Sequence, residues 1–162
     1  MNILTDKIIE ILKASLKEPL NVKRFYFGNP EELASADLPC IFVQPLSKTV
    51  EQLDNIYDLM TANLMIGVCV EAGKYQRKNQ NEGLAERYLA EIEGGRNSDG
   101  TPIQNSITYV LRNHFTMEGT ALHQEQNTVW GERELTGGTA KEIHLYFTFK
   151  VRIKKVSLNV IL

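Results

Sequence analysis

The sequence contains few of the features that mark membrane, secreted or disulfide-rich proteins. No stretch reaches the roughly eighteen consecutive apolar residues that a membrane-spanning helix needs, and the opening residues, MNILTD, lack the basic and apolar regions of a signal peptide. There are only two cysteines, Cys40 and Cys69, each in an apolar segment typical of inert buried thiols. We therefore expect a chain that folds in the cytoplasm, without a disulfide and without a membrane partner.

The sequence also lacks a large excess of positive or negative charge, and it lacks the common catalytic motifs. A net charge of −2 is unfavourable for a general nucleic-acid-binding protein, whose affinity depends on neutralising phosphates. The three histidines lack the spacing of a helical metal site, and no serine lies in a G-x-S-x-G motif. The glycine-rich residues 94–100 lack the Lys-Ser/Thr pair of a phosphate-binding loop. The sequence therefore predicts no enzyme, no metal site and no cofactor.

What the chain does contain is a long two-faced strand at residues 141–154, KEIHLYFTFKVRIK. Side chains alternate between the two faces of a strand, so a period of two separates apolar from polar residues. The apolar set is Ile143, Leu145, Phe147, Phe149, Val151 and Ile153, and the polar set is His144, Tyr146, Thr148, Lys150, Arg152 and Lys154. At about 3.3 Å per residue the strand is on the order of 40 Å long, so it spans or overhangs a domain of this size.

A second strand at residues 59–71 repeats the alternation, with apolar side chains at every even position from Met60 to Val70. We expect the two long strands to be neighbours in a mostly antiparallel sheet. Helices are expected to pack on one face, because the apolar side of a single sheet needs a cover. The sequence thus predicts one α+β domain over residues 1–162, with long strands and an extended loop or hairpin arm.

Local signals predict the remaining elements. Amphipathic spacing predicts three helices, over residues 3–17, 82–93 and 101–114. Thr101 and Pro102 are suited to the cap and the first turn of the last helix. Two short strands are expected, over residues 21–27 and over residues 39–45, which lie between prolines. Residues 31–36 are expected to form a helical turn, and residues 48–58 a loop or the start of the next strand.

Two polar segments and the polar face of the main strand are candidate interaction surfaces. Residues 73–83 are either a solvated loop or a basic finger, and residues 115–140 are long enough for a connection to suggest an arm ordered by a partner. Arginine, tyrosine and tryptophan are residue types that interfaces favour, although lysines on a strand also blunt unwanted pairing and a tryptophan can anchor a hairpin to its own core. The candidate interface residues are Tyr75, Arg77, Lys78, Trp130, Tyr146, Lys150, Arg152 and Lys154. After Ile153 the apolar alternation slips by one, as it does at a bulge or turn before a tail.

The order of these segments resembles the tail terminator proteins of long-tailed bacteriophages. The resemblance lies in an N-terminal amphipathic helix, LTDKIIEILKASL, a strand near a proline, LPCIFVQP, and a long central strand, LMTANLMIGVCVEAG. Helical segments GLAERYLAEIE and TPIQNSITYVLRNHF follow, and then a glycine-led long strand, LTGGTAKEIHLYFTFKVRI. The resemblance implies an α+β fold and a homo-hexameric ring in the neck of the virion that stops polymerisation of the tail tube protein and joins it to the head completion or connector protein. DNA would pass through its lumen without sequence-specific binding.

Two other interpretations remain open from the sequence. Another neck, tail-tube or head-completion protein, or the equivalent part of a tailocin or secretion system, would have a similar α+β pattern. A hot-dog-type thioesterase also lays a helix on a long-stranded antiparallel sheet, but it requires a catalytic Asp or Glu at the start of a helix beside a ligand pocket. No carboxylate in this sequence is a compelling candidate for that role.

Overall fold

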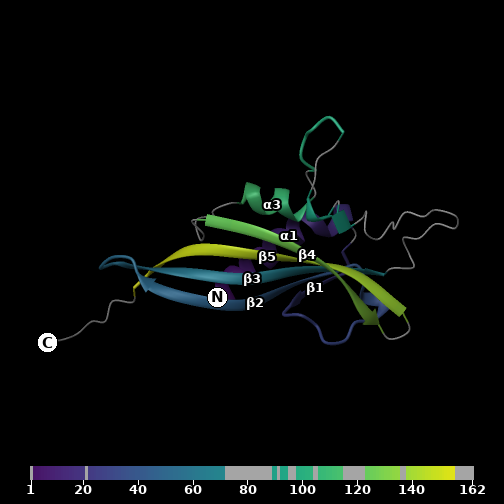
Figure 1. Ribbon diagram of the computed structural model, residues 1–162, viewed down its shortest axis with the longest axis horizontal. Helices are drawn as coiled ribbons and strands as arrows, with labels where there is room; N and C mark the ends of the chain where they lie inside the picture. Colours follow the sequence, from purple (N-terminus) through teal and green to yellow (C-terminus); the bar gives the residue numbers. More distant parts are fainter. Residues whose placement is uncertain are drawn as a thin grey trace.

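The protein folds as a five-stranded sheet with helices on one face (Figure 1). The computed structural model describes residues 2–20, 22–71, 89–90, 92–94, 98–103, 106–114, 123–135 and 138–155. The elements are α1 (Asn2–Leu20), β1 (Arg24–Phe27), a 3₁₀ turn η1 (Ser35–Asp37), β2 (Cys40–Gln52), β3 (Tyr57–Glu71), α3 (Ile107–Asn113), β4 (His123–Leu135) and β5 (Gly138–Lys154). The sheet order is β1-β2-β3-β5-β4, in which β1 is parallel to β2 and every other pair is antiparallel. The α+β class is therefore confirmed.

The two long strands predicted from alternation are β3 and β5, and they are neighbours. They pair antiparallel along their whole length, with Leu64 opposite Phe147 and Thr61 opposite Lys150. Even positions of β3 and odd positions of β5 consequently share the face under the helices, which we call the helix face. β3 has fifteen residues and β5 has seventeen. Together with β2 they extend past the helices at the end that holds the β2–β3 turn, which we call the overhanging end (Figure 1).

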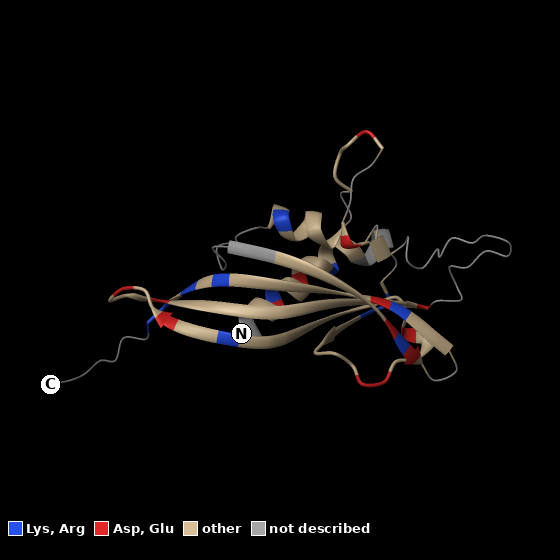
Figure 2. Ribbon diagram, viewed as in Figure 1, with Lys and Arg blue, Asp and Glu red and all other residues tan. Residues whose placement is uncertain are grey.

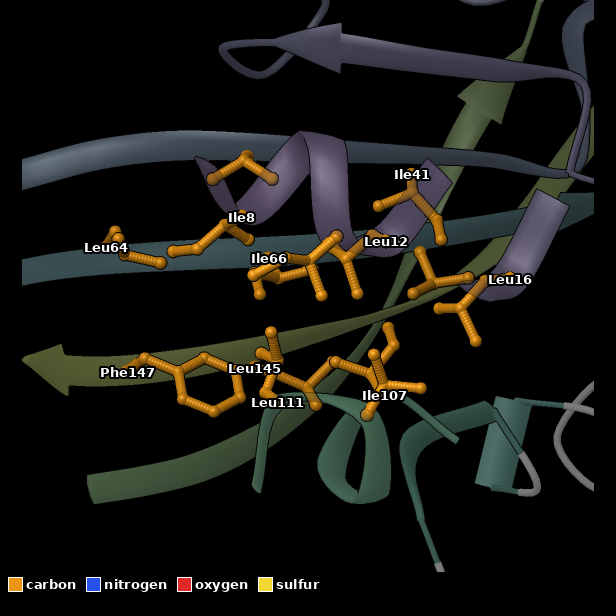
Figure 3. Close-up of a cluster of buried hydrophobic side chains, with 14 of the residues drawn as sticks. Ile8, Leu12, Leu16, Ile41, Leu64, Ile66, Ile107, Leu111, Leu145 and Phe147 are labelled. Carbon is orange, nitrogen blue, oxygen red and sulfur yellow. The ribbon is translucent and has the colours of Figure 1, made fainter. Parts of the chain in front are cut away.

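The helix face holds the main hydrophobic core. Leu4, Ile8, Leu12 and Leu16 recur at helical spacing on α1 and are almost completely buried. They pack against the sheet together with Ile107 and Leu111 of α3 (Figure 3). Each such side chain contributes about 1.5–3 kcal/mol on full burial, so the two helices are fixed to the sheet mainly by this layer.

The opposite face is only partly open to solvent, because the segment between β1 and β2 covers one end of it. Leu33 and Leu38 of that segment pack with Phe42, Met65 and Leu135 in a second buried cluster. The ring of Phe42 lies directly over Gly67, where an added Cβ would come within 1.9 Å of its Cζ atom. Glycine at position 67 is therefore what allows the ring to pack flat on β3. The polar face predicted for β5 is half-buried at this end, at His144 and Tyr146.

Two local predictions are wrong. β2 does not end at Pro45 but continues to Gln52, with a register shift between Pro45 and Ser47. The proline is tolerated because β1 has already ended there and the strand has become an edge. α3 begins after Ser106, whose hydroxyl accepts a hydrogen bond from the Tyr109 backbone N–H, and not at Thr101. In place of a helix start, Asp99 accepts hydrogen bonds from the backbone and hydroxyl of Thr101.

The segment predicted to be an irregular hairpin or arm, residues 115–140, is regular where it is described. Residues 123–135 form β4, a regular strand paired with β5 from His123 opposite Lys150 to Leu135 opposite Gly138, and residues 138–140 belong to β5. Residues 115–122 lie outside the described part of the chain, as do residues 73–83 and the tail after Lys155. Of the helix predicted over residues 82–93, the described residues 89–90 and 92–93 are helical, and Leu89 and Ile92 are buried in the core.

Candidate subunit interface

The exposed apolar side chains of the described residues gather at the borders of the sheet. They are Phe27, Leu46, Val50, Leu53, Ile56, Val129, Trp130 and Ile153, each between 38% and 56% exposed. Phe27, Leu46 and Val50 lie on the β1–β2 side, and Val129 and Trp130 lie on β4 at the opposite side. The other three lie at the overhanging end, in the β2–β3 turn and near the end of β5. Contiguous apolar surface rimmed by polar residues is typical of protein-binding surfaces.

The overhanging end is held in one conformation by its turn. The Asp54 carboxylate accepts hydrogen bonds of 2.7 Å from the backbone N–H groups of Ile56 and Tyr57, and these bonds lower the pKa of this carboxyl group. Lys155 donates from its Nζ to the Asp54 carbonyl and from its backbone N to the Ile56 carbonyl, which ties the end of β5 to the turn. The Arg152 guanidinium lies 4.4 Å from the centre of the Tyr57 ring. Leu53 and Ile56 are therefore presented on a fixed turn.

The β4 edge is also fixed, at two points. Near its start, Gln126 and Thr108 of α3 exchange hydrogen bonds of 2.8 and 3.0 Å. Near its end, Arg133 donates to the Pro30 carbonyl and to Asn29 Oδ1, and its Nε lies 3.0 Å from Glu142 Oε2. Val129 and Trp130 lie between these anchors and are both about half exposed. Beside Trp130 is an open hollow of about 280 Å³, lined by Trp130, Gly131, Glu132 and Lys141.

A buried polar cluster surrounds Glu142, which is only 6% exposed. Its carboxylate accepts a 2.9 Å hydrogen bond from Cys69 Sγ, pairs with Arg133, and lies 3.1 Å from His144 Nε2. Burial raises the pKa of Glu142, but the contacts with His144, Cys69 and Arg133 outweigh it, so the pKa lies below its ordinary value. The cluster joins β3, β4 and β5 and, through Arg133, the segment between β1 and β2.

The cluster contains cysteine, histidine and glutamate, the residue types of a nucleophilic enzyme, but its thiol is unsuited to that chemistry. Cys69 lies opposite Cys40 in the β2–β3 register, and both thiols are free and buried. The hydrogen bond with Cys40, burial and the neighbouring Glu142 raise the pKa of Cys69 far above its usual value. Cys69 is therefore held as a thiol that donates to Glu142, and the group has the arrangement of a structural cluster.

The structure separates the predicted interface residues. Trp130 lies on the helix face of β4, whereas Tyr146, Lys150, Arg152 and Lys154 lie on the opposite face of β5. Tyr146 is half-buried against the second cluster, and Lys150, Arg152 and Lys154 are exposed along the overhanging end. Tyr75, Arg77 and Lys78 lie outside the described residues. The apolar residues Leu46, Val50, Leu53 and Ile56 were not predicted as interface residues, although they interrupt an otherwise polar sequence, LSKTVEQLDNI.

Within the described residues, no group of three or more His, Cys, Asp or Glu side chains is arranged to hold a metal ion. None of the described helices has the length and apolar character needed to cross a membrane. Neither the protein-family models nor the curated proteins include a match to this chain.

Proposed function

We propose that this chain is a tail terminator, a structural protein of a bacteriophage virion. Six copies form a ring on the last ring of the tail tube, stop its polymerisation and present the surface to which the head connector binds. The proposal is supported by the resemblance in the order of the segments and by the long paired strands of the sheet. Such a ring assembles in the host cytoplasm and resides in the neck of the virion.

The observation that carries the proposal is the placement of exposed apolar side chains at opposite borders of one sheet. A cyclic ring requires a heterologous contact, in which two different surfaces of each copy meet. Here the β1–β2 side and the overhanging turn provide one apolar surface, and β4 provides another. The described parts of α1 and α3 contribute no exposed large hydrophobic residue, so the helices offer a less apolar contact.

The charges of the overhanging end suggest how the ring would treat DNA. Lys150, Arg152 and Lys154 lie on one face of β5, opposite the helices. Figure 2 shows blue segments on β5 towards the overhanging end. A row of cations attracts phosphates without reading bases, which suits DNA that passes through a lumen. In the proposed ring this face is turned towards the lumen, and the helices face outwards or towards the tube and the connector.

The function can be tested with the purified chain and the tail tube protein encoded in the same genome. Size-exclusion chromatography with light scattering should give a mass six times that of the single chain, alone or with tube protein. Negative-stain images should show rings at one end of each tube, and addition of the chain during polymerisation should shorten the tubes. A chain that stays monomeric and leaves tube length unchanged would refute the proposal. Polymerisation of the chain itself into tubes would instead assign it to the tube proteins.

A further inference from the structure

The sheet has two strand edges that no described strand covers. β4 is the last strand on one side, and along residues 123–135 its outer edge pairs with no strand of the described residues. On the other side, β1 pairs with β2 only at residues 40–43, so among the described residues β2 has no outer neighbour from 44 to 52. An open edge presents unpaired N–H and C=O groups that can pair with another strand.

The middle of the β4 edge, residues 126–131, lacks the features that usually prevent such pairing. Residues 126–131 contain no charged residue and no proline, and their register with β5 has no shift (Figure 2). Val129 and Trp130, on opposite faces, are 47% and 46% exposed. Natural edges are commonly blunted by charged side chains, proline or a bulge. The charged residues of β4, Glu125, Glu132, Arg133 and Glu134, flank residues 126–131, so this uncharged, regular segment with two half-exposed apolar side chains is the part of the edge best suited to a partner strand.

The β2 edge is protected most strongly at its beginning, and Lys48 and Glu51 are the charged residues within residues 47–52. Pro45, the register shift and Lys48 lie at its start, and beyond them Val50 is 54% exposed on the helix face. The turn that follows adds Leu53 and Ile56, which are 49% and 54% exposed. This edge therefore ends in a group of aliphatic side chains that protrude from the fold.

We propose that the β4 edge of one copy pairs antiparallel with residues 47–52 of β2 in the next copy, so that the sheet continues from subunit to subunit. The aliphatic group of the second copy then packs beside Trp130 of the first. Closure of this contact into a ring rests on the proposed function, whereas the contact itself rests on the two edges.

Strand direction favours this pair. The β2–β3, β3–β5 and β5–β4 pairs are all antiparallel, so β2 and β4 run in opposite directions within one copy. Copies related by rotation about an axis roughly along the strands keep these directions, and β4 then meets the next β2 antiparallel. Antiparallel pairs are the commoner kind, and both faces of the sheet continue across the junction.

The side chains on the helix face are also complementary. By register, Val50 on β2 and Trp130 on β4 both lie on this face. The hollow beside Trp130 is large enough to receive an aliphatic side chain from the neighbour. A two-fold contact between two β4 edges would leave Val50, Leu53 and Ile56 exposed. The heterologous contact buries more of the exposed apolar side chains and is therefore favoured.

The contact can be tested by cross-linking with cysteines on the face opposite the helices. Asn127→Cys on β4 and Thr49→Cys on β2 replace exposed side chains, and a bis-maleimide with a short flexible spacer joins cysteines that lie close together. The native Cys40 and Cys69 are buried and should not react in the folded chain. Ala14→Cys on the exposed side of α1 is the matched control.

A cross-linked dimer should form when the two single variants are mixed, and neither variant alone nor Ala14→Cys should form one. The double variant should give a ladder of cross-linked species that ends at the closed ring. Dimers from Asn127→Cys alone would show a two-fold β4 contact and overturn the inference. Oligomers without a 127–49 cross-link, or a chain that stays monomeric, would overturn it as well. A 127–49 cross-link in a protein that leaves tube length unchanged would support the contact while refuting the terminator function.

Discussion

The packing of Phe42 on Gly67 allows a sharp test of the fold. A Cβ added at position 67 would lie 1.9 Å from Cζ of Phe42 and 2.3 and 2.4 Å from its Cε atoms. The ring would have to retreat by roughly 1.5 Å to regain an ordinary contact. It has little room to do so, because Phe42 is fully buried, with the Arg133 guanidinium 5.3 Å and the His144 ring 5.9 Å from its centre.

The expected magnitude follows from two opposed effects. Replacing glycine by alanine in a strand normally stabilises by about 0.5–1 kcal/mol, because the unfolded chain loses conformational freedom. Overpacking a core costs typically 1–3 kcal/mol and sometimes more, since neighbours must shift from their preferred positions. The overlap here involves a rigid ring in a closed cluster, so we expect Gly67→Ala to reduce the free energy of unfolding by about 2 kcal/mol.

Urea unfolding followed by circular dichroism measures this change. Gly131→Ala on β4 is the matched control, because its Cβ would meet only Glu142, with Cγ at 3.8 Å and Oε1 at 4.0 Å. It should therefore be neutral or stabilise by up to about 1 kcal/mol. In a Phe42→Leu background the ring is gone, and Gly67→Ala should become nearly neutral, with a coupling energy of about 2 kcal/mol. A neutral Gly67→Ala, or additive effects in the double variant, would refute the packing described for this face.

Three further predictions concern the cluster, the helix cap and the edges. Because the pKa of Glu142 is lower in the folded chain than its ordinary 4.5, its stabilisation is present above the unfolded pKa and is lost as the pH falls through the folded pKa. Glu142→Gln should therefore lower the free energy of unfolding in urea by about 3 kcal/mol at pH 7 and should weaken the loss of stability at acid pH. An unchanged dependence of stability on acid pH would contradict the contacts described for Glu142. Ser106→Ala should cost about 1 kcal/mol through loss of the α3 cap, and no loss on urea titration would contradict the cap. Trp130 is the only tryptophan, so its fluorescence emission should shift to shorter wavelength when the copies assemble. Val50→Lys should raise the protein concentration needed for half-maximal assembly about tenfold, whereas Ala14→Lys should leave it unchanged. Equal effects of the two variants would place the contact elsewhere.

The elements that could be predicted from the sequence are those whose apolar pattern lies entirely within one continuous stretch of residues. The alternation of β3 and β5 and the helical spacing of α1 each produce one apolar face, and burial then selects the expected element. The start of α3 was misplaced because Thr101 and Pro102 form an equally good local cap signal, and the choice of Ser106 depends on where Ile107 and Leu111 meet the sheet. Local capping signals alone do not identify which of two starts a helix uses.

β4 and the Glu142 cluster could not be predicted in the same way. β4 lacks clean alternation, because an edge strand beside β5 is half solvated on both faces, and its strand character depends on the partner. The cluster unites Cys69, Arg133 and Glu142, which become neighbours only once the order β3-β5-β4 and its register are known. Among the candidate interface residues that the structure describes, Trp130 lies at the β4 border, and Lys150, Arg152 and Lys154 lie along the overhanging end, so both groups are near exposed apolar side chains.

The position of the buried cluster connects the fold to the proposed contact. Buried ion pairs contribute little net stability, because the desolvation of both charges offsets their attraction. Arg133 of β4 nevertheless pairs with Glu142 of β5 and donates to Pro30 of the covering segment, and Glu142 also accepts a hydrogen bond from Cys69 of β3. Arg133 lies three residues after the half-exposed Trp130. Fixing a strand before it binds reduces the ordering cost of association, so in the proposed contact a cluster that holds the end of β4 would favour binding at that edge. The hydrogen bonds and ion pairs of Glu142 and Arg133 are directional, so they fix the orientation of the edge strand in a way that an apolar cluster of the same volume would not.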